Sequence, residues 1–267
     1  MTDSLGGSNR TLFTGTGWHY ARYRPGYPSM FFTDLVARFH LEGSGRVLDL
    51  GCGTGQLTLR LAQHVAAAIG VDPEPEMLTE AARQAQAACV GNVTWAQASS
   101  ADLPGELGHF DLVTMGRSFH WMDREQVLTA LDGMVDNDGG LVIANDGCLI
   151  RSATTWQQAI EDVQQRFLPP DWQTGIPTSA DGHEPHEEIL ARSAFRHVQQ
   201  RTYQFTRTWT IELAIGYLYS TSIPLHRLLG GRRASFEQEV TDTLLAIDPA
   251  GRFTEPVTLE VLTASKR

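Results

Sequence analysis

The chain has 267 residues, 42% of them hydrophobic and 19% charged, so it can close one sizeable core and carry an elaboration on it. The net charge of −10 argues against a nucleic-acid partner, because such binding usually requires a basic surface. The three scattered cysteines, the absence of a signal-peptide pattern and the absence of a long apolar run lead us to expect a soluble, cytoplasmic protein with no membrane partner.

From residue 46 onward, short apolar runs alternate with stretches of helical periodicity. In chain order, the expected strands are 46–50, 66–72, 92–97, 110–115 and 139–146, and the expected helices are 56–65, 74–87 and 123–135. The strands are apolar throughout, as in parallel strands that are covered on both faces. The pattern predicts the α/β class, with an open, doubly wound and mostly parallel sheet.

The alternation ends after residue 146. We expect a helix at 152–167 and a Pro-rich irregular stretch up to residue 190, which together predict an inserted helical cap at 151–195. Two further strands, 197–210 and 255–265, frame helical segments at 210–229 and 233–247. The predicted organisation is therefore an N-terminal segment 1–40, a core 41–150, the cap 151–195, and a part 196–267 that completes the core domain with an antiparallel terminal strand.

A glycine-rich loop directly follows the strand 46–50, in the sequence VLDLGCGTGQ. Gly51, Gly53 and Gly55 allow the backbone to turn sharply and to approach a ligand at a helix N-terminus. Asp72, at the end of the next strand, has the spacing of a carboxylate that holds ribose hydroxyls. The nicotinamide fingerprint needs a third glycine where this chain has Gln56, so that match fails.

The order of LDLGCGTG, Asp72 and FDLV resembles the class I S-adenosylmethionine-dependent methyltransferases. This resemblance implies a Rossmann-like sheet of seven strands with S-adenosylmethionine as cofactor. It also implies that Gly51, Gly53 and Gly55 back the methionine moiety, with Asp49 nearby, and that Asp72 binds the ribose.

The resemblance also implies an adenine site. Pro73 and Met77 are expected near the ring, although Met77 equally fits the core face of its own helix. Ser99 and Ser100 occupy the positions expected to receive the adenine amino group, and Ser99 stands where an acidic residue is common.

An aromatic cluster surrounds Arg24 in WHYARYRPGYP. By itself this stretch fits an amphipathic helix that covers a sheet edge, with the arginine reaching water. Together with FHW at 119–121, it resembles the branch that contains trans-aconitate-type methyltransferases. The resemblance implies that residues 1–40 form a lid over the cofactor and that Tyr20 and Arg24 contact its methionine end.

The segment after the strand 110–115 reads MGRSFHWMD. His120 is the candidate general base, because ligands bind beyond the carboxyl ends of parallel strands and its reference pKa suits proton acceptance. The resemblance places Ser118 and Phe119 against the cofactor. Trp121 is expected to pack in the core or to line the pocket, and His120 has the alternative role of supporting the same wall.

Substrate contacts are predicted from residue type and from the resemblance. The candidates with apolar bodies and polar tips, or at the predicted rim, are Trp18, His19, Asp146, Trp209, Tyr217 and Tyr219. Asp146 has the alternative role of capping the next turn. The HEPHEE segment, with His183 and His186, lacks a distant third ligand, so we expect no metal.

These features predict methyl transfer to the oxygen or nitrogen, less readily the carbon, of a small organic acceptor such as a secondary metabolite or small acid. Two alternatives remain: a protein of the same fold that binds the cofactor without methyl transfer, and a nicotinamide oxidoreductase. We expect a monomer or a homodimer.

Overall fold

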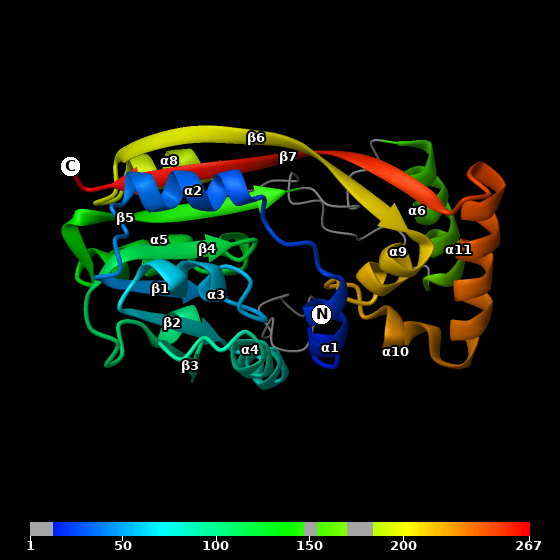
Figure 1. Cartoon of the computed structure of the whole chain (residues 1–267), viewed down its shortest axis with the longest axis horizontal. Coiled ribbons are helices and arrows are strands. Elements are labelled where there is room, and N and C mark those ends of the chain that lie inside the picture. Colours follow the sequence, from blue (N-terminus) through cyan, green and yellow to red (C-terminus); the bar gives the residue numbers. More distant parts are fainter. Residues whose placement is uncertain (1–12, 147–153, 170–183) are drawn as a thin grey trace, which may run out of the picture.

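The computed structural model describes residues 13–146, 154–169 and 184–267. Seven strands form one sheet in the order β3-β2-β1-β4-β5-β7-β6 (Figure 1). The strands are β1 (Arg46–Leu50), β2 (Ala67–Asp72), β3 (Val93–Gln97), β4 (Phe110–Gly116), β5 (Val135–Asp146), β6 (His197–Thr210) and β7 (Arg252–Ser265). Only β7 runs antiparallel to its neighbours β5 and β6. The predicted mostly parallel, doubly wound sheet with an antiparallel terminal strand is confirmed.

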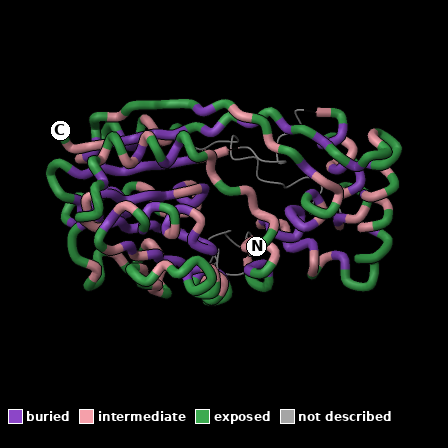
Figure 2. Tube along the Cα trace, in the orientation of Figure 1, coloured by how far each residue is buried: buried purple, intermediate pink, exposed green. Residues whose placement is uncertain are grey.

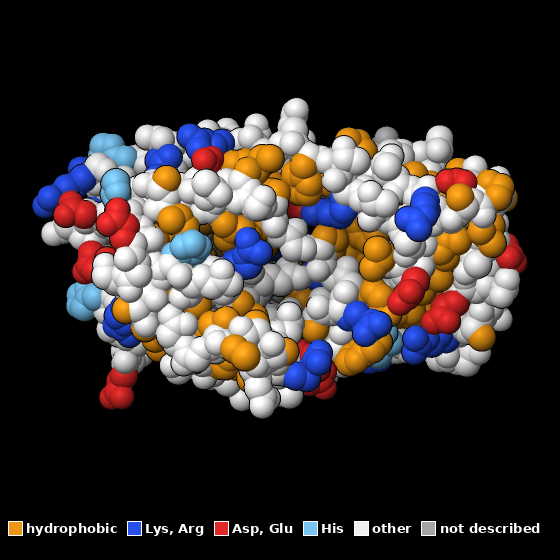
Figure 3. Space-filling model, in the orientation of Figure 1, with side chains coloured by type: hydrophobic (Ala, Val, Ile, Leu, Met, Phe, Trp, Pro, Cys, Tyr) orange, Lys and Arg blue, Asp and Glu red, His pale blue; other side chains and the backbone are white. Residues whose placement is uncertain are grey.

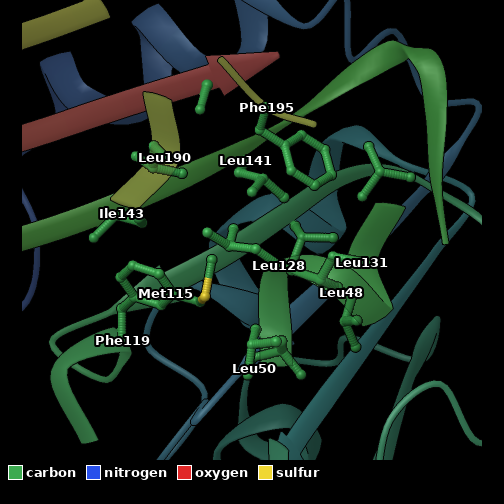
Figure 4. Packing of buried hydrophobic residues seen from close by; sticks show 14 of the residues in the cluster. Leu48, Leu50, Met115, Phe119, Leu128, Leu131, Leu141, Ile143, Leu190 and Phe195 are labelled. Atoms are coloured by element: carbon green, nitrogen blue, oxygen red, sulfur yellow. The ribbon is translucent and has the colours of Figure 1, made fainter. Parts of the chain in front are cut away.

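Helices cover both faces of the central strands, which explains why β1, β2 and β4 are mostly apolar and buried, whereas β6 and β7 carry exposed polar residues. On one face, α2 (Ser29–Arg38) and α3 (Thr58–Leu61) pack on Val47 and Leu112. On the other face, α5 (Arg124–Asp132) and α8 (His186–Ala191) pack on Leu48 and Val113 (Figure 4). Neighbouring strand residues thus enter opposite cores, and the central strands are buried along most of their length (Figure 2).

A separate group of helices, here called the helical layer, packs beside the end of the sheet (Figure 1). It consists of α6 (Thr155–Phe167), α9 (Ile211–Leu218), α10 (Leu225–Leu229) and α11 (Arg233–Ile247), which share one apolar core. The predicted division at residue 195 does not follow this packing. The helical layer combines segments from both sides of that boundary, whereas α8 returns to the sheet.

The N-terminal segment, residues 13–28, is here called the strap. Its helix α1 (Gly17–Tyr23) lies between α4 (Pro75–Ala87) of the sheet domain and α9 of the helical layer (Figure 1). The Thr14 hydroxyl donates to Glu74 Oε2 at 3.3 Å, and the Gly15 backbone N–H donates to Glu76 Oε2 at 2.7 Å. The strap is therefore fixed to the start of α4, next to the carboxyl end of β2.

Candidate cofactor site

A cavity of about 320 Å³ lies where β1, β2 and β4 end and the strap crosses. Its volume is in the range of small-molecule pockets. The lining residues come from the strap, the glycine loop, the ends of β2 and β4, and the segments that follow β3 and β4: Phe13, Tyr20, Leu50, Gly51, Gly53, Val71, Asp72, Pro73, Glu74, Met77, Ala98, Ser99, Ser100, Gly116, Arg117, Ser118, Trp121 and Met122.

The glycine loop forms the floor of the cavity. The backbone N–H of Gly51 donates to Val71 O at 2.8 Å, and this turn requires a left-handed φ of +67°. A Cβ on Gly51 would lie 2.5 Å from Ser118 Cβ, so only glycine fits between the loop and the end of β4. Gly53 also lines the cavity. Gly55 does not, because its Cα faces the Trp95 ring, which a Cβ would meet at 2.6 Å.

The Asp72 carboxylate is the charged group at the end of β2. Its Oδ2 accepts a hydrogen bond from the Gly53 N–H at 2.8 Å, and its Oδ1 accepts one from the Glu74 N–H at 2.9 Å. Burial raises the pKa of Asp72, while these two hydrogen bonds act in the opposite direction. The carboxylate is therefore fixed in orientation and lies on the cavity wall, where it can accept hydrogen bonds from ligand hydroxyls.

The segment around Ser99 closes the cavity beyond β3. The Ser99 hydroxyl donates to Asp102 Oδ2 at 2.9 Å and accepts from the Ala101 N–H at 3.3 Å. An acidic side chain is thus present at this position, supplied three residues later by Asp102. Ser99, Ser100, Pro73 and Met77 all line the cavity. Met77 is only 3% exposed, so it serves both as a core residue and as part of the wall.

Aromatic and polar side chains form the opposite end of the cavity. Tyr20 of the strap faces Gly53, and Ser118 is fixed by its hydroxyl, which donates to Leu50 O at 2.6 Å. Phe13 meets the Trp121 ring edge-on, with the centroids 6.1 Å apart. This end combines π-faces with hydroxyl oxygens, which are suitable surroundings for a cationic group.

Comparisons with known proteins agree with this geometry. The methyltransferase domain family matches residues 47–139. A probable S-adenosylmethionine-dependent methyltransferase of Saccharomyces cerevisiae is 26% identical over 123 residues, 45% of this chain and 42% of that protein. An uncharacterized methyltransferase of Mycobacterium bovis is 28% identical over 167 residues, 55% of this chain and 64% of that protein. The chain spans about half the length of these curated relatives.

The fold is also shared with solved structures. A methyltransferase from Thiobacillus denitrificans, solved with S-adenosyl-L-homocysteine, matches with a TM-score of 0.54 and 18% identity over 96% of this chain and 98% of that one. Over residues 47–139 the chain therefore carries a methyltransferase domain, and its sheet has the fold of this S-adenosylmethionine-dependent methyltransferase.

In this methyltransferase domain, Asp49 is a structural brace and lies outside the cavity lining. Its side chain is 1% exposed. Oδ2 accepts from the Thr58 N–H at 3.1 Å and the Thr58 hydroxyl at 2.6 Å, and Oδ1 accepts from the Thr114 hydroxyl at 2.8 Å. Asp49 therefore ties β1 to β4 and to α3, and it supports the glycine loop from behind.

The brace makes folding stability depend on pH. Burial raises the pKa of Asp49 to about 6, well above the ordinary value of an aspartate, so the folded state binds this proton more tightly than the unfolded chain does. Its stabilising contribution is full below the unfolded pKa and is lost as the pH rises through the folded value. We therefore expect the free energy of unfolding of the wild type, measured with urea, to fall between about pH 5 and about pH 8 by about 1.4 kcal/mol more than that of Asp49→Asn. Parallel curves for the two proteins would contradict this assignment.

The segment after β4 differs from the expectation at Phe119 and agrees with one of the two expected roles of Trp121. Phe119 is fully buried in the core under α8, where its ring lies 5.0 Å from that of His186, so its predicted cofactor contact is corrected to a packing role. Trp121 lines the cavity instead. His120, between them, packs its ring 4.8 Å from that of Trp121 and is not among the lining residues, so its role as a base stays a prediction.

Three predicted substrate residues belong to the core of the helical layer. The side chains of Trp209, Tyr217 and Tyr219 are each 1% exposed. The Trp209 indole N–H donates to Glu255 Oε2 at 2.8 Å, and the Tyr219 hydroxyl donates to Glu237 Oε1 at 3.0 Å. The predicted substrate contact is therefore corrected to a packing role for all three.

The remaining predicted contacts on the strap lie beside the cavity. Trp18 is 51% exposed, and His19 packs between Trp18 and Tyr219, so the substrate roles of Trp18 and His19 stay predictions. The Arg24 guanidinium lies between the rings of Tyr20 and Tyr217, at 5.2 and 5.0 Å from their centroids. Tyr20 lines the cavity and Arg24 is not among its lining residues, so the cofactor contact of Arg24 stays a prediction.

The Asp146 carboxylate forms ion pairs with Arg117 and Arg207 inside the protein. Burial alone would raise its pKa, but the guanidinium groups of Arg117 and Arg207 hold the pKa of Asp146 well below its usual value. It therefore remains a carboxylate at ordinary pH and does not accept a substrate proton. Several cavity residues were not predicted from the sequence, and Arg117 is the charged one whose place directly after the end of β4 could have indicated it. His183 lies outside the described residues.

Proposed function

We propose that the protein transfers a methyl group from S-adenosylmethionine to an oxygen or nitrogen atom of a small organic molecule. The observation that carries the proposal is the cavity itself, which has a fixed carboxylate, Asp72, at one end and an aromatic rim at the other. The resemblance to the trans-aconitate-type branch and a place in secondary metabolism remain finer predictions within this proposal.

The residues of the cavity fit the cofactor. The loop around Gly51 and Gly53 leaves a cradle that side chains would fill, and Asp72 accepts hydrogen bonds as a ribose site requires. Pro73 and Met77 supply the apolar wall for an adenine ring, and Tyr20 and Trp121 supply the aromatic surroundings for a sulfonium. When bound, S-adenosylmethionine supplies an activated methyl group.

The contribution of the protein is mainly to align the reactants and to exclude water. Tyr20 and Phe13 on the strap cover the cavity, while the glycine loop and Asp72 fix the ligand from the sheet side. Alignment of this kind can lower a barrier by about 7–11 kcal/mol in favourable cases. No cavity residue is required to act as a nucleophile.

A small acceptor is supported by the surface of the protein. On the face in Figure 3, Lys and Arg side chains are scattered among acidic ones rather than gathered in a basic stripe. The parts of the chain that the structure describes contain no helix long and apolar enough to cross a bilayer. The strap lines the cavity and also contacts helix α9 of the helical layer, which favours an acceptor small enough to fit beneath the strap.

The proposal is tested by incubating the protein with S-adenosylmethionine and a panel of phenols, amines and carboxylic acids, and by measuring S-adenosylhomocysteine. We expect product that requires both the wild-type protein and an acceptor. Cofactor binding without product from any acceptor would instead indicate a protein that binds the cofactor without turnover. Binding of a nicotinamide dinucleotide alone would indicate an oxidoreductase.

His120 gives a separate test of how the reaction works. We expect His120→Ala to lower kcat by less than about tenfold, because its ring packs on Trp121 outside the cavity and because alignment can replace a general base. The measurement is kcat across the pH range. A loss of about 100-fold or more, together with loss of a kinetic pKa near the histidine value, would establish the base role.

A further inference from the structure

Arg117 adopts a backbone conformation that non-glycine residues rarely take. Its φ is +56°, directly after the glycine that ends β4, and its side chain is only 6% exposed. Such strain persists only where surrounding contacts hold it in place. The contacts of the guanidinium group are therefore the features that maintain this turn.

The guanidinium joins the rim of the sheet to the strap. Nε and Nη2 donate to the two carboxylate oxygens of Asp146 at 2.6 and 2.8 Å, which makes a bidentate ion pair with the end of β5. Nη1 donates to Pro25 O at 3.0 Å, and the group lies 4.7 Å from the centroid of the Tyr27 ring. Pro25 and Tyr27 both belong to the strap, so one side chain holds two of its residues.

A continuous series of polar contacts extends from this point to the helical layer. Asp146 Oδ2 also accepts from Arg207 Nη2 at 2.9 Å, and Arg207 Nη1 donates to Glu255 Oε2 at 3.3 Å. Glu255 then accepts from the Trp209 indole and, at 3.1 Å, from Gln157 Nε2 of α6. Two arginines and two carboxylates alternate along this series, so each buried charge faces an opposite one.

The strap has other attachments on the far side of the cavity, in its middle and at the helical layer, where the Tyr23 hydroxyl donates to Glu212 Oε1 of α9 at 3.3 Å. Thr14 and Gly15 bind the start of α4, and Gln56 Nε2 donates to Arg24 O at 2.8 Å. Phe13 and Tyr20, which line the cavity, lie on the strap between or beside these attachment points. Arg117 thus fixes the strap to the ends of both β4 and β5 through hydrogen bonds.

We propose that Arg117 is a positioning residue that anchors the strap over the cavity, and that the series from Asp146 to Glu255 links this anchor to the helical layer. The anchoring itself is independent of the proposed methyl transfer. Its consequence for cofactor affinity rests on that proposed function, because the strap carries Tyr20 and Phe13 into the cavity wall.

The test compares Arg117→Gly with the wild type by hydrogen–deuterium exchange of the protein without ligand. Glycine accepts a positive φ without strain, so the turn after β4 is kept while the guanidinium is lost. We expect amides of the strap to exchange at least about tenfold faster, while peptides from β2 and α4 keep their wild-type rates. Wild-type exchange of the strap in a folded Arg117→Gly protein would overturn the proposal.

Two further variants separate anchoring from charge balance. Arg117→Lys keeps a cation beside Asp146 but lacks the planar guanidinium. Its thermal stability should therefore be higher than that of Arg117→Gly, while its strap still exchanges fast. Arg201→Gln is the matched control. Arg201 lies on β6, as Arg207 does, but its ion pair with Asp34 is on the exposed surface. Arg201→Gln should change neither the thermal stability nor the exchange rates of the strap. Full restoration of strap protection by lysine would reduce the role of Arg117 to charge balance.

Kinetics supply the readout that depends on function. Arg117→Gly should raise KM for S-adenosylmethionine about tenfold or more, with a smaller change in kcat at saturation. Fast strap exchange in the variant, with no cofactor binding by the wild type, would refute the proposed function and leave the anchor standing. Cofactor binding by the wild type, with unchanged strap exchange in Arg117→Gly, would refute the anchor and leave the proposed function standing.

Discussion

Gly51→Ala is expected to weaken binding of S-adenosylhomocysteine by at least about 30-fold, because two costs arise at one position. The residue has a φ of +67°, which an alanine adopts only with strain, and the added Cβ would lie 2.5 Å from Ser118 Cβ. Left-handed strain and overpacking together cost about 2–5 kcal/mol. The loop relieves this cost by moving into the cavity that it lines, so ligand affinity falls with it. Titration calorimetry measures the effect.

Gly43→Ala is the matched control. Gly43 also has a positive φ, +87°, but a Cβ there would meet no atom within 4 Å and the residue lies on the surface. We expect this variant to lose about 1–2 kcal/mol of folding stability from backbone strain alone and to bind the ligand as the wild type does. Wild-type affinity in Gly51→Ala, or equal losses of affinity in the two variants, would contradict the role of the loop.

Asp72→Asn is expected to weaken the same ligand by about 10- to 100-fold, since hydrogen bonds to a charged acceptor contribute about 1.5–3 kcal/mol. The amide also cannot accept hydrogen bonds through both atoms, as the carboxylate does from the Gly53 and Glu74 N–H groups. The orientation of the loop is therefore disturbed together with the ribose site. Calorimetry at one pH, with thermal unfolding in parallel, separates loss of affinity from loss of fold.

The comparison with Asp49→Asn makes this prediction specific. Both aspartates are buried next to the glycine loop, but only Asp72 lines the cavity. We expect Asp49→Asn to change ligand affinity by less than about fivefold, because the amide oxygen can still accept from the Thr58 N–H and hydroxyl while its NH₂ group donates to the Thr114 hydroxyl, which can rotate. A larger loss of affinity in Asp49→Asn than in Asp72→Asn would reverse the two assignments.

The sequence predicted the features that depend on local pattern. The uniformly apolar strands specify a sheet covered on both faces, and the glycines with Asp72 specify a turn and a carboxylate at adjacent strand ends. These signals are short in range, because each depends on residues within one strand–loop–helix unit. The sheet was therefore predicted closely, although β5 begins at Val135, four residues before its expected start.

The features that the sequence did not reveal depend on distant contacts. Residues 119–121 form a 3₁₀ turn, in which successive side chains point in three different directions, so one residue decides whether a ring faces the cavity or the core. Phe119 was assigned to the cavity, and Trp121 was left between core and cavity, for this reason. Arg117 and Asp146 are 29 positions apart, and only the pairing of β4 with β5 brings them together.

The helical layer shows the same limit. Its core joins α6 with α9 and α11, which are separated in the sequence by α8 and β6. Aromatic residues such as Trp209 carry the same signal in a substrate pocket as in a core, because both are apolar with a polar tip. Their assignment requires knowledge of what packs against them.

The most direct test of the central claim, that this cavity holds S-adenosylmethionine, is a crystal structure of the protein with S-adenosylhomocysteine. We expect the ligand to lie beneath the strap, with its ribose hydroxyls donating hydrogen bonds to the Asp72 carboxylate and its adenine between Met77 and Ser99. Ligand bound at another place, or a cavity without ligand at a concentration that saturates binding in solution, would contradict it.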